Sequence, residues 1–273
     1  MSLNHQYYKD NVMRLVGGQL PKNRKQFYLK VLDNSLQQGM FGYFDPEPRE
    51  GKVIFSNDEA FIMLDNKNIC VVDRSLVTFD PETGDTVQVR AYARRDFDGY
   101  CVTGPKPETR TMSNGTTYVV ESTILGGRAV KLPVPEAKCY ELKSLIELLE
   151  TDRLPDGFRH LTHMLVDAQA RDFEIVDPVP DDIFRTPPAV SFSVNTRKHC
   201  GRVRVFYNRG LDSFGIELLQ DGERTYFDDY VLFNELGTRL HDLIDDGAWN
   251  RIDVDLIAAA KKPRKAKQLA QAA

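Results

Sequence analysis

Two histidines and an aspartate close together in the chain could hold a metal ion. His160, His163 and Asp167 follow one another at intervals of three and four residues in the stretch RHLTHMLVDAQARD. On a helix with about 3.6 residues per turn, these three side chains fall within about 60° of one another. Imidazole and carboxylate groups are common ligands of zinc and related metals. The spacing therefore predicts a candidate metal site, and with it a metal-dependent hydrolase or nuclease.

The same side chains could form the solvent-facing polar side of an ordinary helix, and we favour this interpretation. Metalloprotease helices place two histidines four residues apart, with a glutamate directly after the first. Here Leu161 occupies the position of that glutamate. A fourth ligand would have to come from a distant segment, and the sequence offers His199, Cys200, His241 and Asp242.

A basic stretch with strand-like alternation gives a second chemical signal. Between Ile183 and Leu211 the chain has six basic residues and no acidic residue. If the valines of GRVRVFY face a core, the two arginines and the phenylalanine of that stretch share the outer face. Arginine can grip a phosphate with two parallel N–H groups, and aromatic rings stack on bases. The pattern predicts contact with nucleic acid or another polyanion through Arg197, Lys198, Arg202, Arg204, Phe206 and Arg209.

The C-terminal segment is basic too. KKPRKAKQ has five bases in seven positions, among them Lys261, Lys262, Arg264 and Lys265. Such a run adds non-specific affinity for nucleic acid through counterion release, or it simply solubilises a chain terminus. We interpret residues 261–273 as a basic, disordered tail that joins the arginines in one positive surface. For the basic stretch at residues 195–210, the competing interpretation is a charged edge strand that blocks aggregation, with its arginines paired to the acids of residues 221–229.

Hydrophobic periodicity predicts the elements that must position these residues. Helical spacing of apolar residues and stop signals indicate four helices, whereas short runs rich in β-branched and aromatic residues indicate strands. The final segment, DVDLIAAAKK, is expected to begin as a short helix. The predicted helices are 22–38, 138–150, 156–172 and 228–247, and the predicted strand regions are 52–134 and 189–228.

This order of elements predicts an α+β fold with mostly antiparallel sheets, because no helical period interrupts the first strand region. An N-terminal β-rich unit with a leading helix would be followed by a helix–helix–sheet–helix unit. The proline-containing segment LPVPEAK marks the expected seam. We therefore predict domains at residues 1–134 and 135–260, followed by the tail.

Composition excludes several classes of protein. The 273 residues contain four widely spaced cysteines, no CxxC pair and no apolar run long enough to span a bilayer. The N-terminus lacks a secretory signal, so we expect a cytoplasmic protein with reduced thiols and no membrane partner. Phosphate-binding loops, dinucleotide fingerprints and the hydrolase G-x-S-x-G motif are absent, and no cofactor is identified.

The leading hypothesis is a non-catalytic cytoplasmic binding or regulatory protein that contacts nucleic acid or another polyanion. The formal net charge of −4 hides separate basic and acidic blocks, so local patches matter more than the total. The first alternative is the metal-dependent enzyme built on the two histidines and the aspartate. The second alternative is a protein–protein adaptor, which would expose a sizeable apolar patch and no basic face.

Overall fold

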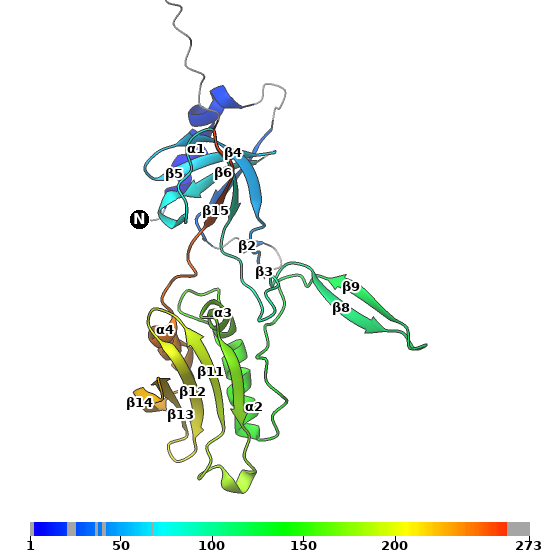
Figure 1. Ribbon diagram of the computed structural model, residues 1–273, viewed down its shortest axis with the longest axis vertical. Coiled ribbons are helices and arrows are strands. Elements are labelled where there is room, and N and C mark those ends of the chain that lie inside the picture. Colours follow the sequence, from blue (N-terminus) through cyan, green and yellow to red (C-terminus); the bar gives the residue numbers. More distant parts are fainter. Residues whose placement is uncertain (1–2, 21–25, 36–37, 40–41, 67, 261–273) are drawn as a thin grey trace, which may run out of the picture. The chain divides into compact units, whose positions relative to one another are not determined.

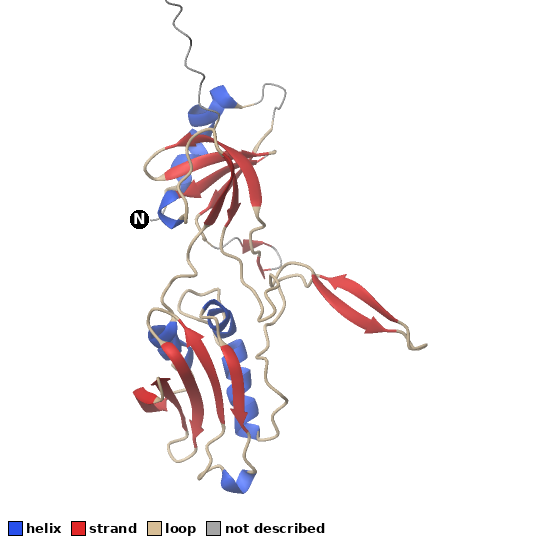
Figure 2. Cartoon of the chain, viewed as in Figure 1, coloured by secondary structure: helices blue, strands red, loops and turns tan. Residues whose placement is uncertain are grey.

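The computed structural model describes residues 3–20, 26–35, 38–39, 42–66 and 68–260. These residues form helices and sheets, and most neighbouring strands run antiparallel (Figure 2). The α+β class with mostly antiparallel sheets, predicted from the sequence, is confirmed.

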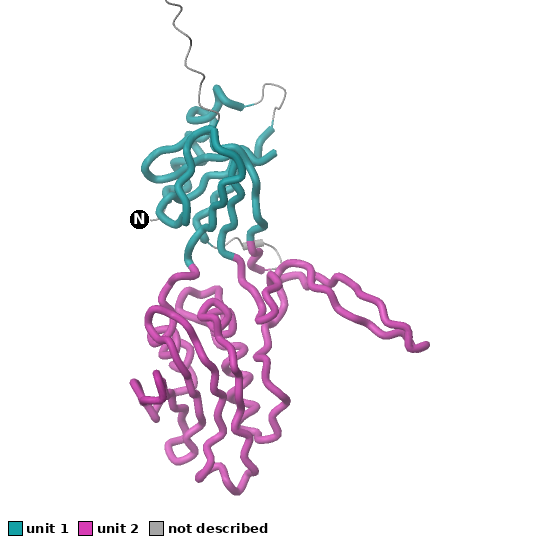
Figure 3. The backbone as a smooth tube through the Cα atoms, viewed as in Figure 1, with its two compact units in different colours: residues 1–35, 46–92, 250–273 teal, residues 36–45, 93–249 magenta. Residues whose placement is uncertain are grey.

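The chain forms two compact units, and each combines segments that are distant in sequence (Figure 3). Unit 1 contains residues 1–35, 46–92 and 250–273, and unit 2 contains residues 36–45 and 93–249. Residue 134, the expected seam, lies inside unit 2. The chain passes from unit 1 into unit 2 and back twice, a path that composition and proline content do not reveal.

Unit 1 is built on one six-stranded sheet (Figure 1). Its strand order is β1-β6-β5-β4-β7-β15, with β1 and β6 parallel and every other pair antiparallel. The last strand therefore comes from the far end of the described chain. The strands are β1 (Tyr28–Leu32), β4 (Arg49–Ser56), β5 (Ala60–Asp65), β6 (Asn68–Asp73), β7 (Thr86–Arg90) and β15 (Asp253–Ala258).

Both faces of this sheet are buried, because side chains alternate between two apolar clusters. On one face, helix α1 (His5–Val16) packs Tyr8, Val12 and Val16 against the sheet. The other face buries side chains from all six strands in a single cluster, so the sheet curls around it. Asn34, which follows β1, bonds to Asn250 and to the carbonyl of Arg251 before β15.

Two predicted helices of unit 1 are wrong. Within the predicted helix 22–38, residues 28–32 form β1, and residues 22–25 and 36–37 lie outside the described part of the chain. The final segment forms β15 instead of a helix. In both places the chain completes a sheet edge, since β1 pairs with β6 and β15 pairs with β7. Pairing with a distant strand overrides local helical spacing.

Unit 2 contains a five-stranded antiparallel sheet in the order β10-β11-β12-β13-β14. Every strand pairs with its neighbour in sequence, which gives a simple meander. Bulges interrupt the pairing of β10 with β11 and of β13 with β14. The strands are β10 (Arg171–Val176), β11 (Ala189–Asn195), β12 (Cys200–Asn208), β13 (Ser213–Gln220) and β14 (Glu223–Val231).

Three helices contribute to one core with this sheet: α2 (Tyr140–Thr151), α3 (Leu161–Asp167) and α4 (Leu236–Ile244). The predicted helices exist but are shorter than expected at several ends. Residues 156–160 precede α3, and residues 228–231 belong to β14. The core cluster includes Leu145, Leu161 and Leu240 from the helices together with inward side chains of the strands. The helices thus cover one face of the sheet, and the other face carries the polar positions of each strand.

Two short ribbons complete unit 2. Strands β2 (Gln38–Gly39) and β3 (Gly42–Tyr43) pair with each other, as do β8 (Lys106–Thr111) and β9 (Thr117–Ser122). The four cysteines are free thiols, of which Cys70 and Cys139 are buried and Cys200 is exposed. No helix in the described part of the chain is both long enough and apolar enough to span a membrane.

Candidate functional site

The outer face of the unit 2 sheet gathers four arginines and two phenylalanines. In β12, Val203 and Val205 belong to the core, so the residues between them point to the outer face. The antiparallel register then decides which side chains of the other strands lie beside them. We call this surface the arginine face and define it by Arg171, Arg202, Arg204, Phe206, Glu174, Glu217, Arg224 and Phe227.

Two transverse rows make up most of the arginine face. The first row crosses all five strands in the order Arg171, Ser193, Arg202, Leu219 and Arg224. The second row crosses them in the order Glu174, Ser191, Arg204, Glu217 and Phe227. Neighbouring strands are about 4.8 Å apart, so the three arginines of the first row are spread across the whole sheet.

Aromatic rings and guanidinium groups stack at one side of this face. The rings of Phe206 and Phe227 are stacked, with centroids 6.1 Å apart and planes at 21°. The guanidinium carbon of Arg204 lies 4.9 Å from the centroid of the Phe206 ring, and that of Arg224 lies 4.6 Å from the centroid of the Phe227 ring. Phe206 is buried, whereas 46% of Phe227 is exposed. Phe227 therefore presents an accessible ring with a cation held beside it.

A glycine makes room for the buried ring. Gly215 of β13 lies directly opposite Phe206 in the register. A Cβ atom on Gly215 would lie only 2.2 Å from Cζ of Phe206. The absence of a side chain at this position lets the Phe206 ring cross over β13 and meet the neighbouring strand.

Carboxylates accompany the arginines of this face. Glu217 pairs with Arg204 at 3.5 Å and with Arg224 at 3.6 Å. Glu174 pairs with Arg202, which also donates to the carbonyl oxygen of Asp172 at 2.7 Å. The two rows together carry four guanidinium groups and two carboxylates. Asp172, in the bulge of β10, adds a third carboxylate 3.6 Å from Arg171.

The other predicted interface residues that the structure describes lie away from this face. Arg197 bonds to Asp246, and Lys198 donates to the carbonyl oxygens of His241 and Asp242 at the C-terminal end of α4. Arg209 pairs with Glu141 in the first turn of α2 at 2.8 Å. Lys261, Lys262, Arg264 and Lys265 lie outside the described residues. Of the predicted residues within the described ranges, only Arg202, Arg204 and Phe206 lie on the arginine face.

Sequence reasoning missed Arg171, Arg224 and Phe227. The alternation of charged and apolar residues in RDFEIV and ERTYF marks both segments as half-buried strands. That pattern could have placed these side chains on a solvent face. It could not have shown that they join Arg202 and Arg204, because the partner strands and their register come only from the fold.

The predicted metal ligands are placed differently from the expectation. His160 precedes α3 instead of lying on it, and its backbone N–H donates to Nδ1 of His163 at 2.9 Å. The two imidazole rings have centroids 5.5 Å apart. Asp167 pairs with Arg159 at 2.8 Å. Within the described residues, no three histidine, cysteine, aspartate or glutamate side chains are grouped so that they could hold a metal ion.

His163 is also not a solvent-facing residue, which corrects the polar-helix interpretation. The side chain is 4% exposed, and burial, followed by the charge of Arg94, lowers the pKa of His163 to about 3. Nδ1 accepts the N–H of His160, so the neutral ring carries its proton on Nε2, which has no hydrogen-bond partner among the described residues. The buried imidazole is thus a neutral acceptor for the backbone at the start of α3.

Arg159 forms the most deeply buried ionic cluster of unit 2. Its side chain is fully buried and bonds to Asp156 at 2.7 Å, to Asp167 and to Asp245. Its guanidinium carbon lies 3.8 Å from the centre of the Trp249 ring. Burial by itself would lower the pKa of Arg159, but Asp245 and Asp167 raise it above its ordinary value. The cluster joins the start of α3 to the end of α4, which is a structural role.

The chain matches no known protein family, and no curated protein or solved structure is similar to it.

Proposed function

We propose that this chain is a non-catalytic cytoplasmic binding protein of regulatory character, and that the arginine face of unit 2 binds single-stranded nucleic acid. The observation that carries the proposal is the register of the five-stranded sheet. It aligns Arg171, Arg202 and Arg224 in one row and places Arg204, Phe206 and Phe227 beside them. A site for single-stranded nucleic acid has two components: cationic side chains that follow the phosphate backbone, and aromatic rings that stack on the bases.

The paired carboxylates do not exclude phosphate binding. The side chain of Glu174 is 75% exposed, and an exposed ion pair contributes only about 0–1 kcal/mol. Glu217 divides its contacts between two arginines at 3.5 and 3.6 Å, which is longer than a good charge-assisted hydrogen bond. Breaking either ion pair therefore costs little free energy, and a phosphate that takes the place of the carboxylate can accept two parallel N–H groups from the arginine.

A single strand suits this face better than a duplex does. The accessible ring of Phe227, with Arg224 beside it, offers a platform for an unstacked base. Bases in a duplex are already stacked on one another and cannot reach such a ring. Stacking also predicts little sequence preference, because every base has an aromatic face.

Fluorescence anisotropy of labelled oligo(dT) and oligo(U), titrated with the full-length chain at several salt concentrations, tests the proposal. We expect saturable binding that weakens with salt, and weaker binding of a duplex of equal length. Phe227→Ala should reduce the affinity about tenfold through loss of one stacked base. Arg224→Ala should reduce the slope of the logarithm of the binding constant against the logarithm of the salt concentration by about 0.7.

Arg239→Ala supplies the matched control, because Arg239 is an exposed arginine of α4 in the helical layer. Its affinity should equal that of the wild type. A second variant measures the contribution of the C-terminal segment to the affinity apart from that of the sheet. In it, glutamine replaces Lys261, Lys262, Arg264 and Lys265. No binding at low salt, or binding that Phe227→Ala and Arg224→Ala leave unchanged, would refute a role for this face.

A further inference from the structure

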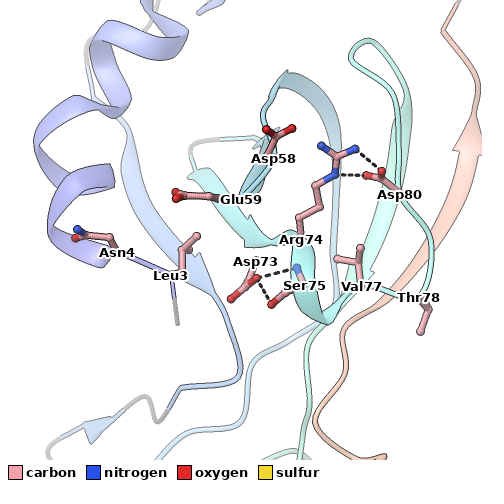
Figure 4. Close-up of a pocket in the computed structure, with 10 residues that line it drawn as sticks. All are labelled: Leu3, Asn4, Asp58, Glu59, Asp73, Arg74, Ser75, Val77, Thr78 and Asp80. Carbon is pink, nitrogen blue, oxygen red and sulfur yellow. Dashed lines mark hydrogen bonds and ion pairs between the residues drawn. The ribbon is translucent and has the colours of Figure 1, made fainter. Parts of the chain in front are cut away.

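Unit 1 contains a large cavity with four carboxylates and one arginine among its ten lining residues. It has a volume of about 970 Å³, within the usual range of small-molecule sites. It lies between the residues that precede α1, the β4–β5 turn and the segment that follows β6 (Figure 4). The lining residues are Leu3, Asn4, Asp58, Glu59, Asp73, Arg74, Ser75, Val77, Thr78 and Asp80.

The charges on these walls are unbalanced. Arg74 donates to both carboxylate oxygens of Asp80 and to the carbonyl oxygen of Asn57. The hydrogen bond with Asp80 raises the pKa of Arg74 above its ordinary value. Asp58, Glu59 and Asp73 form no ion pair with any described residue. Three carboxylates thus line the cavity outside any ion pair among the described residues, and Arg74, whose pKa the charge of Asp58 also raises, is already held by Asp80.

Asp73 adds an observation of its own. The residue is 5% exposed, and its Oδ1 accepts from the backbone N–H and the hydroxyl of Ser75 at 2.9 and 2.7 Å. Its other oxygen accepts no hydrogen bond from the described residues and turns away from Ser75 (Figure 4). A carboxylate oxygen that is largely withdrawn from water is costly unless a donor approaches it. A cationic ligand in the cavity would supply that donor.

An aromatic ring extends the site. A neighbouring hollow of about 440 Å³ shares Asn4, Asp58 and Glu59 with the cavity and is also lined by Tyr7. Tyr7 is 39% exposed. An accessible ring beside carboxylates is a favourable surface for an ammonium group, because the ring face is negative.

The spread of the carboxylates favours an organic cation over a metal ion. Among the residues that the structure describes, no three carboxylate, imidazole or thiol groups converge as a metal would require. Leu3 and Val77 add apolar surface that a hydrated ion would not use. We propose that this cavity binds a small oligoamine, with one ammonium group on Asp73 and another near Asp58, Glu59 and Tyr7. The proposal is independent of the arginine face, which lies in unit 2.

Isothermal titration of the full-length chain with spermidine, at low salt and without nucleic acid, tests this inference. We expect one saturable site that weakens with added salt. Asp73→Asn preserves an acceptor for Ser75 and removes the charge, and Glu59→Gln removes an exposed charge at little risk to folding. Each should weaken spermidine binding about tenfold. Glu50→Gln is the matched control, because Glu50 is an exposed carboxylate of β4 that does not line the cavity.

Two further probes sharpen the result. The neutral chain 1,8-octanediol should not bind, and Mg²⁺ at the same concentration should not displace spermidine. Saturable binding in the wild type that Glu59→Gln and Asp73→Asn both weaken supports the proposal. No saturable binding of spermidine, equal affinity in folded Glu59→Gln, binding of the diol, or displacement by Mg²⁺ would overturn it.

Discussion

The guanidinium carbon of Arg159 lies over the ring of Trp249, 3.8 Å from the ring centre, and the arginine side chain is fully buried there. Three aspartates from three places in the chain surround it. These partners offset the cost of burying the charge, because each of the three guanidinium nitrogens donates a hydrogen bond to a different carboxylate.

Arg159→Met should therefore destabilise the protein by about 3–5 kcal/mol, since three aspartates would lose their shared cation in the interior. The free energy of unfolding from urea titration measures the effect. Arg153→Met is the control, because Arg153 is exposed and close in sequence, and it should change stability by less than about 0.5 kcal/mol. Similar losses in both variants would contradict a special role for the buried cluster.

His163 should make the protein sensitive to acid. Its pKa in the folded protein is about 3, below the ordinary value of 6.5, so the unfolded chain binds more protons between these two values. The stability contribution is fully present above pH 6.5 and is lost as the pH falls toward 3. The slope is at most about 1.4 kcal/mol per pH unit.

His163→Asn tests that contribution, because the amide oxygen can replace Nδ1 as the acceptor for His160 and does not titrate. Denaturant titrations at pH 7.5, 6 and 5 should show a shallower loss of stability in the variant than in the wild type. His241→Asn serves as a control at a partly exposed histidine. Parallel pH profiles for His163→Asn and the wild type would contradict the expectation.

Thiol reactivity should follow burial. Burial raises the pKa of Cys70 to about 12, and it also raises the pKa of Cys139. Cys200 is exposed. An aromatic disulfide reagent should label Cys200 rapidly in the native protein and Cys70 only after denaturation, because the thiolate is the reactive form. Cys200→Ser should remove the fastest phase, and fast labelling of Cys70 would show that the unit 1 core opens readily.

Gly215→Ala should disturb the arginine face from beneath. The added Cβ would lie 2.2 Å from Phe206, so the ring must move, at an expected cost of about 1–3 kcal/mol. Oligonucleotide binding should fall with it. Removing the ring as well, in Gly215→Ala/Phe206→Ala, should make the two losses less than additive. Gly210→Ala is the control, because a Cβ atom there would come no closer than 3.4 Å to Oδ1 of Asn208.

The sequence alone determined the local features of this protein. The class of fold followed from runs of alternating and helical apolar residues, and the outward direction of Arg202, Arg204 and Phe206 followed from the period of two in a strand. Both depend on neighbours within a few residues. The helix expected at 22–38 was wrong because a strand there is stabilised by parallel pairing with β6, which begins about forty residues later.

Only the tertiary structure decided which side chains meet. Arg159 and Asp245 are 86 residues apart in sequence, yet they form an ion pair. Arg171 and Arg224 lie on opposite edge strands and share one row only because the three strands between them pair in this register. The cavity of unit 1 likewise brings Leu3 and Asn4 to Asp73 and Asp80. Strand order and register depend on the burial of both sheets as a whole, and no short stretch of sequence contains that information.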